Sequence, residues 1–328
     1  MSKIQSVRVS YTRISKYLRC PFSHYLTYVE KLVPKSPSRS LQFGKDFHTL
    51  LEHRGDTKEQ LKQVFKELKI TYDNYPEWFQ EVLGETYVKD LKTIFNDYRK
   101  RYKDADVPNS TEFEFNIDLG ESELGEKIIF NGFIDGLYFD ESNTPNEYTV
   151  IEEHKTFYQK PDPVTLLFST QKHLYAKAVE LTFGAMPAGI LWDYIKNVPA
   201  AEPFILKSGK FSEAKNANVT PYSWRRACKK AGFDDKEYIN RGKELYDKNI
   251  SNYFFREYQP FNKDMVDKTF EDFKSVAIDV VNNGDGKKVK NCTKDCSWCE
   301  YKPICRAEFN GDDIMAVVDR EFTERGKR

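Results

Sequence analysis

The first of three consecutive predicted strands alternates apolar and polar side chains, which is the pattern of a half-buried β-strand, and the two segments after it also read as strands. A helical pattern and a fourth apolar run follow them along the chain. The bounds of these three strands, the helix and the fourth strand are 111–119, 127–140, 148–157, 164–182 and 188–196. Turn-forming residues at 140–146 separate the second strand from the third. Antiparallel strands followed by a strand–helix–strand unit predict a mixed α/β fold with a helix across the sheet.

Helical patterns flank this strand-rich part on both sides. Pro21 marks a break between two short helices within residues 11–30. Further amphipathic helices are predicted at 42–53, 57–69, 83–103 and 258–281.

These patterns divide the chain into five predicted regions. The insertion among them has a looser, charged pattern and is expected to form one wall of a cleft. The regions are an N-terminal helical region (1–110), a strand-rich core (111–199), the insertion (200–257), a C-terminal helix with a cysteine cluster (258–308) and a charged tail (309–328).

Composition sets limits on the partners of the protein. The 51 basic and 51 acidic residues cancel, so a nucleic acid would have to be held by a local basic groove. Stretches at 207–210, 225–230 and 287–290 are candidates for its lining, but such stretches are more often solvated faces than binding sites, so none is assigned as a site. The sequence has no apolar run near the ~20 residues that span a bilayer and no apolar N-terminal signal. We therefore expect a cytoplasmic protein without a membrane partner, in which structural disulfides are rare.

Two carboxylates and a lysine on neighbouring predicted strands carry the strongest functional signal. Asp135 lies on the second strand, while Glu153 and Lys155 lie on the third and share one face, opposite to Glu152 and His154. Pairing of the two strands would place Asp135 beside Glu153. Adjacent carboxylates repel each other unless a hard divalent cation lies between them. Such an ion polarises phosphodiesters and activates water, which Lys155 could orient; the alternative is an exposed charge network.

Six cysteines in a chain of this kind need another explanation than disulfides. Cys296, Cys299 and Cys305 form a tight group of soft ligands, and Cys228 stands alone. Four thiolates complete the shell of a tetrahedral zinc or of an iron–sulfur cluster. From spacing alone, the fourth ligand is either the nearby Cys292 or the distant Cys20.

Over about 11–200 and 258–306, the sequence resembles the PD-(D/E)XK nucleases and, within them, the RecB-like exonucleases. The resemblance implies a restriction-endonuclease-like core with a mixed β-sheet flanked by helices. It also implies the functional residues of the site. These are His48, Asp135, Glu153 and the His154 carbonyl as metal ligands, with Lys155, Gln171 and Tyr175 completing the catalytic set.

The supporting residues of this set also have ordinary explanations. His48 follows Gly44 at the family spacing, but a lone helical histidine is usually a hydrogen-bonded surface or core residue. Gln171 and Tyr175 are four residues apart and share a helix face, as an ordinary polar pair would. The side chain of His154 is expected to be structural or exposed. Glu152 in place of Glu153 would break the spacing to Lys155.

Members of the same family with an iron–sulfur cluster have one cysteine before the motif histidine and a C-x-x-C-x5-C motif near the C-terminus. This resemblance implies a [4Fe-4S] cluster held by Cys20, Cys296, Cys299 and Cys305, with zinc as the alternative occupant. Whether Cys292 replaces Cys20 stays open. The cluster would act as a structural clasp, because joining distant residues closes a very long loop.

The resemblance implies an exonuclease that uses Mg²⁺ or Mn²⁺ to hydrolyse DNA with a free end or a single strand. One alternative is a structure-selective endonuclease on the same fold. Another is a DNA-binding assembly subunit without activity, against which the intact Asp135, Glu153 and Lys155 argue. Polarity of digestion, pathway, oligomeric state and protein partners do not follow from the sequence.

Overall fold

The computed structural model describes residues 6–102, 107–139, 144–212, 218–233 and 236–326. The strands are β1 (Ser6–Val9), β2 (Leu32–Pro34), β3 (Ser110–Glu121), β4 (Lys127–Tyr138), β5 (Val150–Phe157), β6 (Gly189–Lys196), β7 (Phe254–Pro260) and β8 (Phe322–Glu324). The helices are α1 (Tyr11–Arg19), α2 (Pro21–Tyr28), α3 (Arg39–Glu52), α4 (Lys58–Asp73), α5 (Glu77–Leu83), α6 (Tyr87–Tyr102), α7 (Pro163–Leu167), α8 (Thr170–Phe183), α9 (Pro221–Ala231), α10 (Lys236–Tyr246), α11 (Lys263–Asn283), α12 (Lys302–Asn310) and α13 (Ile314–Glu321).

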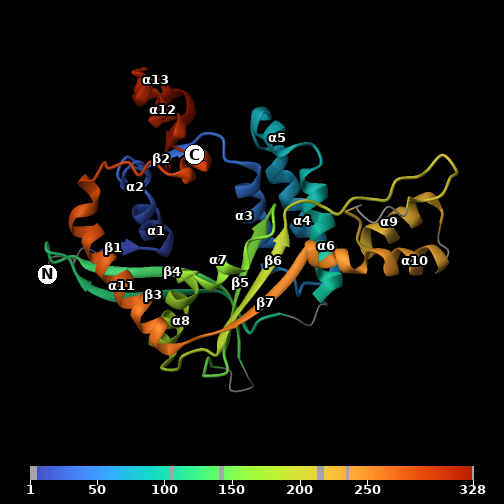
Figure 1. Ribbon diagram of the computed structural model, residues 1–328, viewed down its shortest axis with the longest axis horizontal. Coiled ribbons are helices and arrows are strands. Elements are labelled where there is room, and N and C mark those ends of the chain that lie inside the picture. Colours follow the sequence, from blue (N-terminus) through green and yellow to red (C-terminus); the bar gives the residue numbers. More distant parts are fainter. Residues whose placement is uncertain (1–5, 103–106, 140–143, 213–217, 234–235, 327–328) are drawn as a thin grey trace.

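Six of the strands form one mixed sheet at the centre of the molecule (Figure 1). β3 and β5 run antiparallel to β4, β6 runs parallel to β5, and β7 closes the sheet antiparallel to β6. The short β1 pairs in parallel with the first part of β4. This arrangement confirms the predicted α/β class, with a mixed sheet flanked by helices.

Helices cover both faces of the sheet, as consecutive residues of β6 illustrate. Tyr194 packs in a core with Leu174 of α8 and Phe270 of α11, whereas Ile195 packs in another with Phe47 of α3. Because neighbouring side chains on a strand point to opposite faces, the two cores lie on opposite sides of the sheet. A residue of β5 or β6 therefore faces either α8 or α3, depending on its position.

The last residues of the chain pack against the segment from α2 to β2 in a small subdomain, called the terminal subdomain. β2 pairs antiparallel with β8, and Leu26, Tyr301 and Phe322 share a buried cluster. The Tyr301 hydroxyl lies 2.8 Å from that of Thr27 and donates to the Leu32 carbonyl at 2.7 Å. The segment predicted as a charged tail thus contains α13 and β8, which hold the C-terminal region against the N-terminal one.

The predicted insertion contributes both a small helical unit and a strand. α9 and α10 pack around Trp224 and project at the opposite end of the long axis from α1 and α11 (Figure 1). β7 follows them and belongs to the central sheet, so the helix predicted at 258–281 begins only at Lys263.

The remaining predicted strands and helices match observed ones, with small shifts of their bounds. The strands β1, β2, β7 and β8 and the helix α5 were not foreseen, and the helix predicted at 164–182 is divided into α7 and α8 at residues 168–169. The predicted turn at 140–146 lies partly outside the described residues. Among the described helices, none is long and apolar enough to span a membrane.

Candidate active site

The site lies where β4 and β5 stop pairing and diverge, a place called the fork. The two strands pair over only three positions, from Gly136–Tyr138 on β4 to Val150–Glu152 on β5. Gly136 and Glu152 form the last pair. Asp135 precedes Gly136 on β4 and Glu153 follows Glu152 on β5, so both lie directly beyond this pair. In place of a ladder bond, the Asp135 Oδ2 atom accepts the backbone N–H of His154 at 2.7 Å. The divergence of the strands therefore places two carboxylates beside the opening instead of inside a continuous ladder.

On the α3 side of this fork, three potential metal ligands meet. His48 on α3, Glu112 on β3 and Asp135 each offer one ligand atom, and these atoms lie within 4.8 Å of one another. The His48 Nδ1 atom is 3.5 Å from Asp135 Oδ1. The three residues line a small cavity of about 10 Å³ together with His154. His48 and Asp135 are thus brought together as the sequence predicted.

On the α8 side, Glu153 and Lys155 form a hydrogen-bonded group with two residues of α8. Lys155 Nζ donates to Glu153 Oε1 at 2.5 Å and to Gln171 Oε1 at 3.2 Å. The Gln171 amide nitrogen lies 2.9 Å from both Glu153 Oε1 and the Tyr175 hydroxyl. The i,i+4 pair on α8 therefore orients one oxygen of Glu153, and the four predicted residues lie together.

The two carboxyl groups have opposite pKa shifts. Burial disfavours ionisation of Asp135, but the hydrogen bond and charge of His48, with a contribution from His154, outweigh it and hold its pKa at about 2. Burial and the negative charge of Asp135 raise the pKa of Glu153 to about 7, despite the opposing charge of Lys155. The metal-free site thus holds one firmly ionised carboxylate and one that resists ionisation, as expected where two carboxyl groups share a site.

This raised pKa predicts a pH-dependent loss of stability in the metal-free protein. The folded-state pKa of Glu153 lies above its usual value of 4.5, so the folded protein keeps a proton that the unfolded chain releases. The stabilising contribution is complete below pH 4.5 and is lost as the pH rises to about 7. Relative to Glu153→Gln, the wild type should lose about 3 kcal/mol of unfolding free energy over this interval. Urea unfolding in EDTA at several pH values measures the difference, and a pH-independent difference would contradict the assignment.

Beneath the fork, on the α3 face, lies a buried charge network. Glu152 and Asp193 are fully buried, and His154 lies between them with its Nδ1 atom 2.9 Å from Asp193 Oδ2. Arg54 Nη2 donates to Glu152 Oε2 at 2.5 Å, and Arg256 Nε donates to Asp193 Oδ1 at 3.2 Å. Burial opposes protonation of His154, but Glu152 and Asp193 outweigh it and raise its pKa. The His154 side chain is therefore structural, as the sequence analysis expected.

Glu152, His154 and Asp193 could be mistaken for a second metal site, because their ligand atoms also lie within 4.8 Å of one another. Two guanidinium groups already bind the carboxylate oxygens that a cation would need. Charge is thus balanced by Arg54 and Arg256, which agrees with an ion network and not with a metal centre.

Sequence reasoning missed Glu112 and both arginines. Glu112 lies opposite Asp135 across β3 and β4, since its neighbours Thr111 and Phe113 pair with Gly136 and Ile134. Its φ of +48° is rare outside glycine, and such conformations concentrate at functional sites. The alternation of TEFEF predicted a regular strand and gave no sign of this irregularity. Arg54 and Arg256 belong to no motif, and only the fold brings them together.

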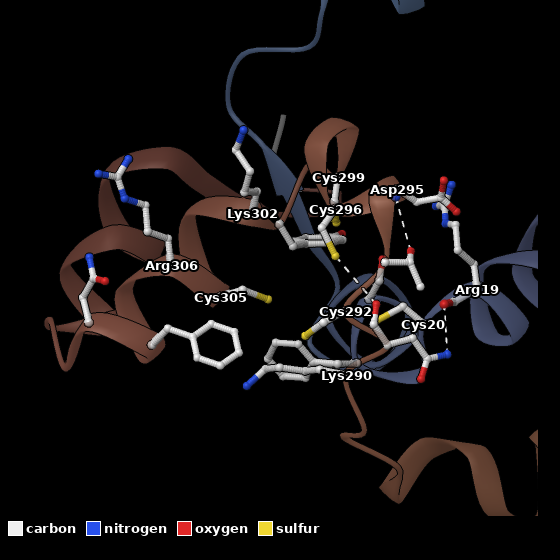
Figure 2. Close-up of a pocket in the computed structure, with 17 residues that line it drawn as sticks. Arg19, Cys20, Lys290, Cys292, Asp295, Cys296, Cys299, Lys302, Cys305 and Arg306 are labelled. Atoms are coloured by element: carbon white, nitrogen blue, oxygen red, sulfur yellow. Dashed lines mark hydrogen bonds between the residues drawn. The ribbon is translucent and has the colours of Figure 1, made fainter.

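The cysteines lie in the terminal subdomain, apart from the carboxylates. Cys20, between α1 and α2, lines one pocket of about 520 Å³ with Cys292, Cys296, Cys299 and Cys305. Figure 2 shows Cys20 on the N-terminal segment facing the four cysteines of the C-terminal segment. None of the described cysteines forms a disulfide bond.

Burial raises the pKa of the Cys305 thiol to about 11, although Lys290 opposes the shift, and the charges of Cys299 and Cys20 raise it further. Cys20 and the C-terminal cysteines thus line one pocket, whereas Cys228 is buried in the α9–α10 unit. No three described cysteines have sulfur atoms within 4.8 Å of one another.

Known proteins resemble this chain in sequence and in structure. The sequence model of the PD-(D/E)XK nuclease superfamily matches residues 8–306, which include both carboxylates of the fork and Lys155. No curated protein matches the chain. Among solved structures, a candidate exonuclease from Eubacterium rectale is 11% identical and has a TM-score of 0.48, with 88% of this chain and 85% of that chain covered. The protein SSO0001 is 11% identical with a TM-score of 0.35, over 93% of this chain and 90% of its own.

The family match also accounts for the architecture. A mixed sheet flanked by helices, with the carboxylates at a fork of its central strands, agrees with the restriction-endonuclease-like core that the sequence predicted. The chain belongs to the PD-(D/E)XK nuclease superfamily.

Proposed function

We propose that the protein is a divalent-metal-dependent deoxyribonuclease with its catalytic centre at Asp135, Glu153 and Lys155. One observation carries the proposal: the Oε2 atom of Glu153 is buried and accepts no hydrogen bond from a described residue, whereas Oε1 is held by Lys155 and Gln171. A buried carboxylate oxygen without a partner is costly. Beside the ionised Asp135, this oxygen is suited to binding a hard cation.

The donor set fits Mg²⁺ or Mn²⁺. Asp135, Glu153, His48 and the His154 carbonyl are the proposed ligands, and Glu112 is an additional carboxylate within 4.8 Å of the ligand atoms of His48 and Asp135. A cation bound there would polarise the phosphodiester and lower the pKa of a water molecule. Side chains of the protein would orient the attacking water and stabilise the negative charge on the phosphate.

Lys155 is the proposed group that orients the attacking water and stabilises negative charge on the phosphate. Burial opposes its protonation, but the charge and hydrogen bond of Glu153 outweigh this and raise its pKa, so the ammonium stays charged at neutral pH. Gln171 and Tyr175 fix the geometry of this pair from α8. A preorganised positive charge of this kind costs no reorganisation during the reaction.

We further propose that the enzyme is an exonuclease, a preference that follows from the resemblance to RecB-like enzymes. The test compares end-labelled linear DNA with covalently closed circles, single- and double-stranded, in Mg²⁺, Mn²⁺ or EDTA. An exonuclease degrades linear DNA and spares circles. Cutting of circles would instead establish the endonuclease alternative, and DNA binding without turnover in any metal would establish a binding subunit.

The cysteine pocket is the proposed site of a structural iron–sulfur cluster. A tetrahedral zinc with Zn–S bonds of about 2.3 Å would hold its four sulfurs about 3.8 Å apart. The wider spacing of the described thiols and a pocket of about 520 Å³ favour a larger cluster over a single ion. Lys290, Lys302 and Arg306 line the same pocket and would balance the charge of the thiolates.

Cys20→Ser is expected to remove the cluster and loosen the terminal subdomain. The loss of one of four thiolates leaves an incomplete shell, and metal binding contributes directly to folding in sites of this kind. Iron, sulfide and zinc contents, visible absorption and limited proteolysis of anaerobically purified protein measure the change.

Cys292→Ser is the matched control, because Cys292 lines the same pocket but lies outside the proposed set. It should keep the visible spectrum and full iron content. If Cys292→Ser loses the cluster and Cys20→Ser keeps it, Cys292 is the fourth ligand in place of Cys20. Zinc in place of iron in wild-type protein would contradict the iron–sulfur assignment.

A further inference from the structure

A second pocket lies beyond the proposed active site, at the carboxyl ends of β5 and β6. Its volume is about 500 Å³, and Tyr158, Lys160 and Lys196 line it. Asn218 and Asn252, from the predicted insertion, also line it. No described residue that lines this pocket is acidic, although the chain as a whole has as many acidic as basic residues.

The register of the sheet places this pocket in line with Lys155. Lys196 lies opposite Phe157 in the parallel β5–β6 pair, and Tyr194 lies opposite Lys155. Side chains at alternate positions share a face, so Lys196 is on the same face as Lys155 and Glu153. Phe157, which lines the pocket, lies two positions after Lys155 on β5, and this corresponds to about 7 Å along the strand.

The charges of the two lysines are available for an external anion. The Lys160 ammonium lies 4.3 Å from the centre of the Phe255 ring, and that of Lys196 lies 5.1 Å from the centre of the Tyr253 ring. A cation–π contact positions an ammonium group without neutralising it. Neither lysine forms an ion pair with a carboxylate in the described part of the chain. By contrast, Lys177 is paired with Glu180.

The chemistry of the lining fits a nucleic-acid strand better than a small apolar ligand. Two uncompensated ammonium groups attract phosphate, and the asparagine side chains can bond to phosphate or sugar oxygens. Tyr158 is 66% exposed and presents a ring on which a base can stack. DNA rises about 3.4 Å per nucleotide, so a strand cut beside Lys155 would bring a phosphate to the pocket about two nucleotides away.

We propose that this lysine pocket, formed by Tyr158, Lys160 and Lys196, binds a phosphate group of the DNA strand that is being cut. The inference rests on the proposed function and extends it, because it assigns a second anchoring point for the substrate. The phosphate is either internal to the strand or the terminal phosphate of a free end. The pocket acts in binding and leaves the chemical step to the residues of the fork.

The test is a Lys160→Ala/Lys196→Ala double variant on single-stranded oligonucleotides. Losing two charged contacts should weaken binding and raise KM about 10- to 100-fold, with kcat little changed. The slope of log affinity against log salt should become less steep by about 0.7, the change for one phosphate contact on a single strand. The Lys160→Arg/Lys196→Arg variant should restore most of the binding and also controls for folding.

Lys62→Ala/Lys66→Ala on α4 is the matched control, since both lysines are exposed and the loss of charge is the same. Substrates with a 5′-phosphate, substrates with a 5′-hydroxyl and single-stranded circles distinguish the two sources of phosphate. An equal loss on all three supports binding of an internal phosphate. A loss confined to phosphorylated ends supports binding of a terminal one.

Binding of fluorescent oligonucleotide in EDTA separates this inference from the proposed function. If the wild type cleaves DNA and the double alanine variant has the same KM, affinity and salt slope, the proposed role of the lysine pocket is wrong, while the proposed nuclease function stands. Lysine-dependent binding by a wild-type protein that cuts no DNA would overturn the nuclease assignment and leave a phosphate-binding pocket. An equal effect of the Lys62→Ala/Lys66→Ala control would also overturn the pocket, because it would show a general charge effect.

Discussion

Lys155→Ala is expected to lower kcat for DNA cleavage by about 10²–10³-fold, the usual cost of losing a preorganised electrostatic group. The ammonium group contacts Glu153 and Gln171 and stays charged, so its removal takes away a fixed positive charge from the proposed catalytic centre. Because this charge acts mainly in the transition state, KM should change little. Single-turnover kinetics on end-labelled DNA in Mg²⁺ measure the chemical step directly.

Two controls distinguish a catalytic role of Lys155 from a structural one. Lys62→Ala removes an exposed lysine on α4, far from the fork in sequence, and should leave kcat unchanged. Oligonucleotide binding and the unfolding midpoint of Lys155→Ala should stay near those of the wild type. A Lys155→Ala protein that is folded and cleaves at the wild-type rate would remove this residue from the mechanism.

Arg54→Met is expected to lower the free energy of unfolding by about 3–5 kcal/mol, the range for removing one partner of a buried ion pair. Arg54 is 5% exposed and Glu152 is fully buried, so the substitution leaves the Glu152 charge without its closest guanidinium partner. Arg54 also lies 3.0 Å from His154 Nε2, which links it to the strand that carries Glu153 and Lys155. Urea unfolding at neutral pH measures the loss.

An exposed ion pair provides the comparison for Arg54. Lys69 and Asp73 on α4 lie 2.5 Å apart, but more than half of each side chain is exposed. Lys69→Met should therefore cost only about 0–1 kcal/mol. The Arg54→Met/Glu152→Gln double variant should recover part of the stability lost in Arg54→Met, because the uncompensated charge is gone. A loss below about 1 kcal/mol in Arg54→Met would contradict the importance of the network.

The arrangement of Glu153 and Lys155 could be predicted from the sequence because strand alternation is a local property. Both residues face α8, while Glu152 and His154 face the buried network near α3, as their spacing implies. The Gln171–Tyr175 contact likewise follows from helical spacing. The elements that carry these residues were predicted with small differences in their bounds.

Features that depend on contacts between distant segments could not be predicted in the same way. Arg54 and Glu152 are 98 residues apart, and no local pattern distinguishes this arginine from an exposed one. β1 has four residues, too few for a clear alternation, and β7 lies in a segment whose charged surroundings suggested an insertion. The left-handed conformation of Glu112 interrupts an otherwise regular strand. The position of Cys20 beside the C-terminal cysteines was expected only through the family resemblance.

The most direct test of the nuclease assignment is metal-dependent cleavage of linear DNA by wild-type protein and Glu153→Gln under the same conditions. The substitution keeps the size of the side chain but removes a carboxylate whose buried Oε2 accepts no hydrogen bond from a described residue. We predict degradation by the wild type in Mg²⁺ or Mn²⁺, none in EDTA, and none by the folded Glu153→Gln protein. Cleavage that persists in Glu153→Gln, or a folded wild type that cuts no DNA in either metal, would contradict the account.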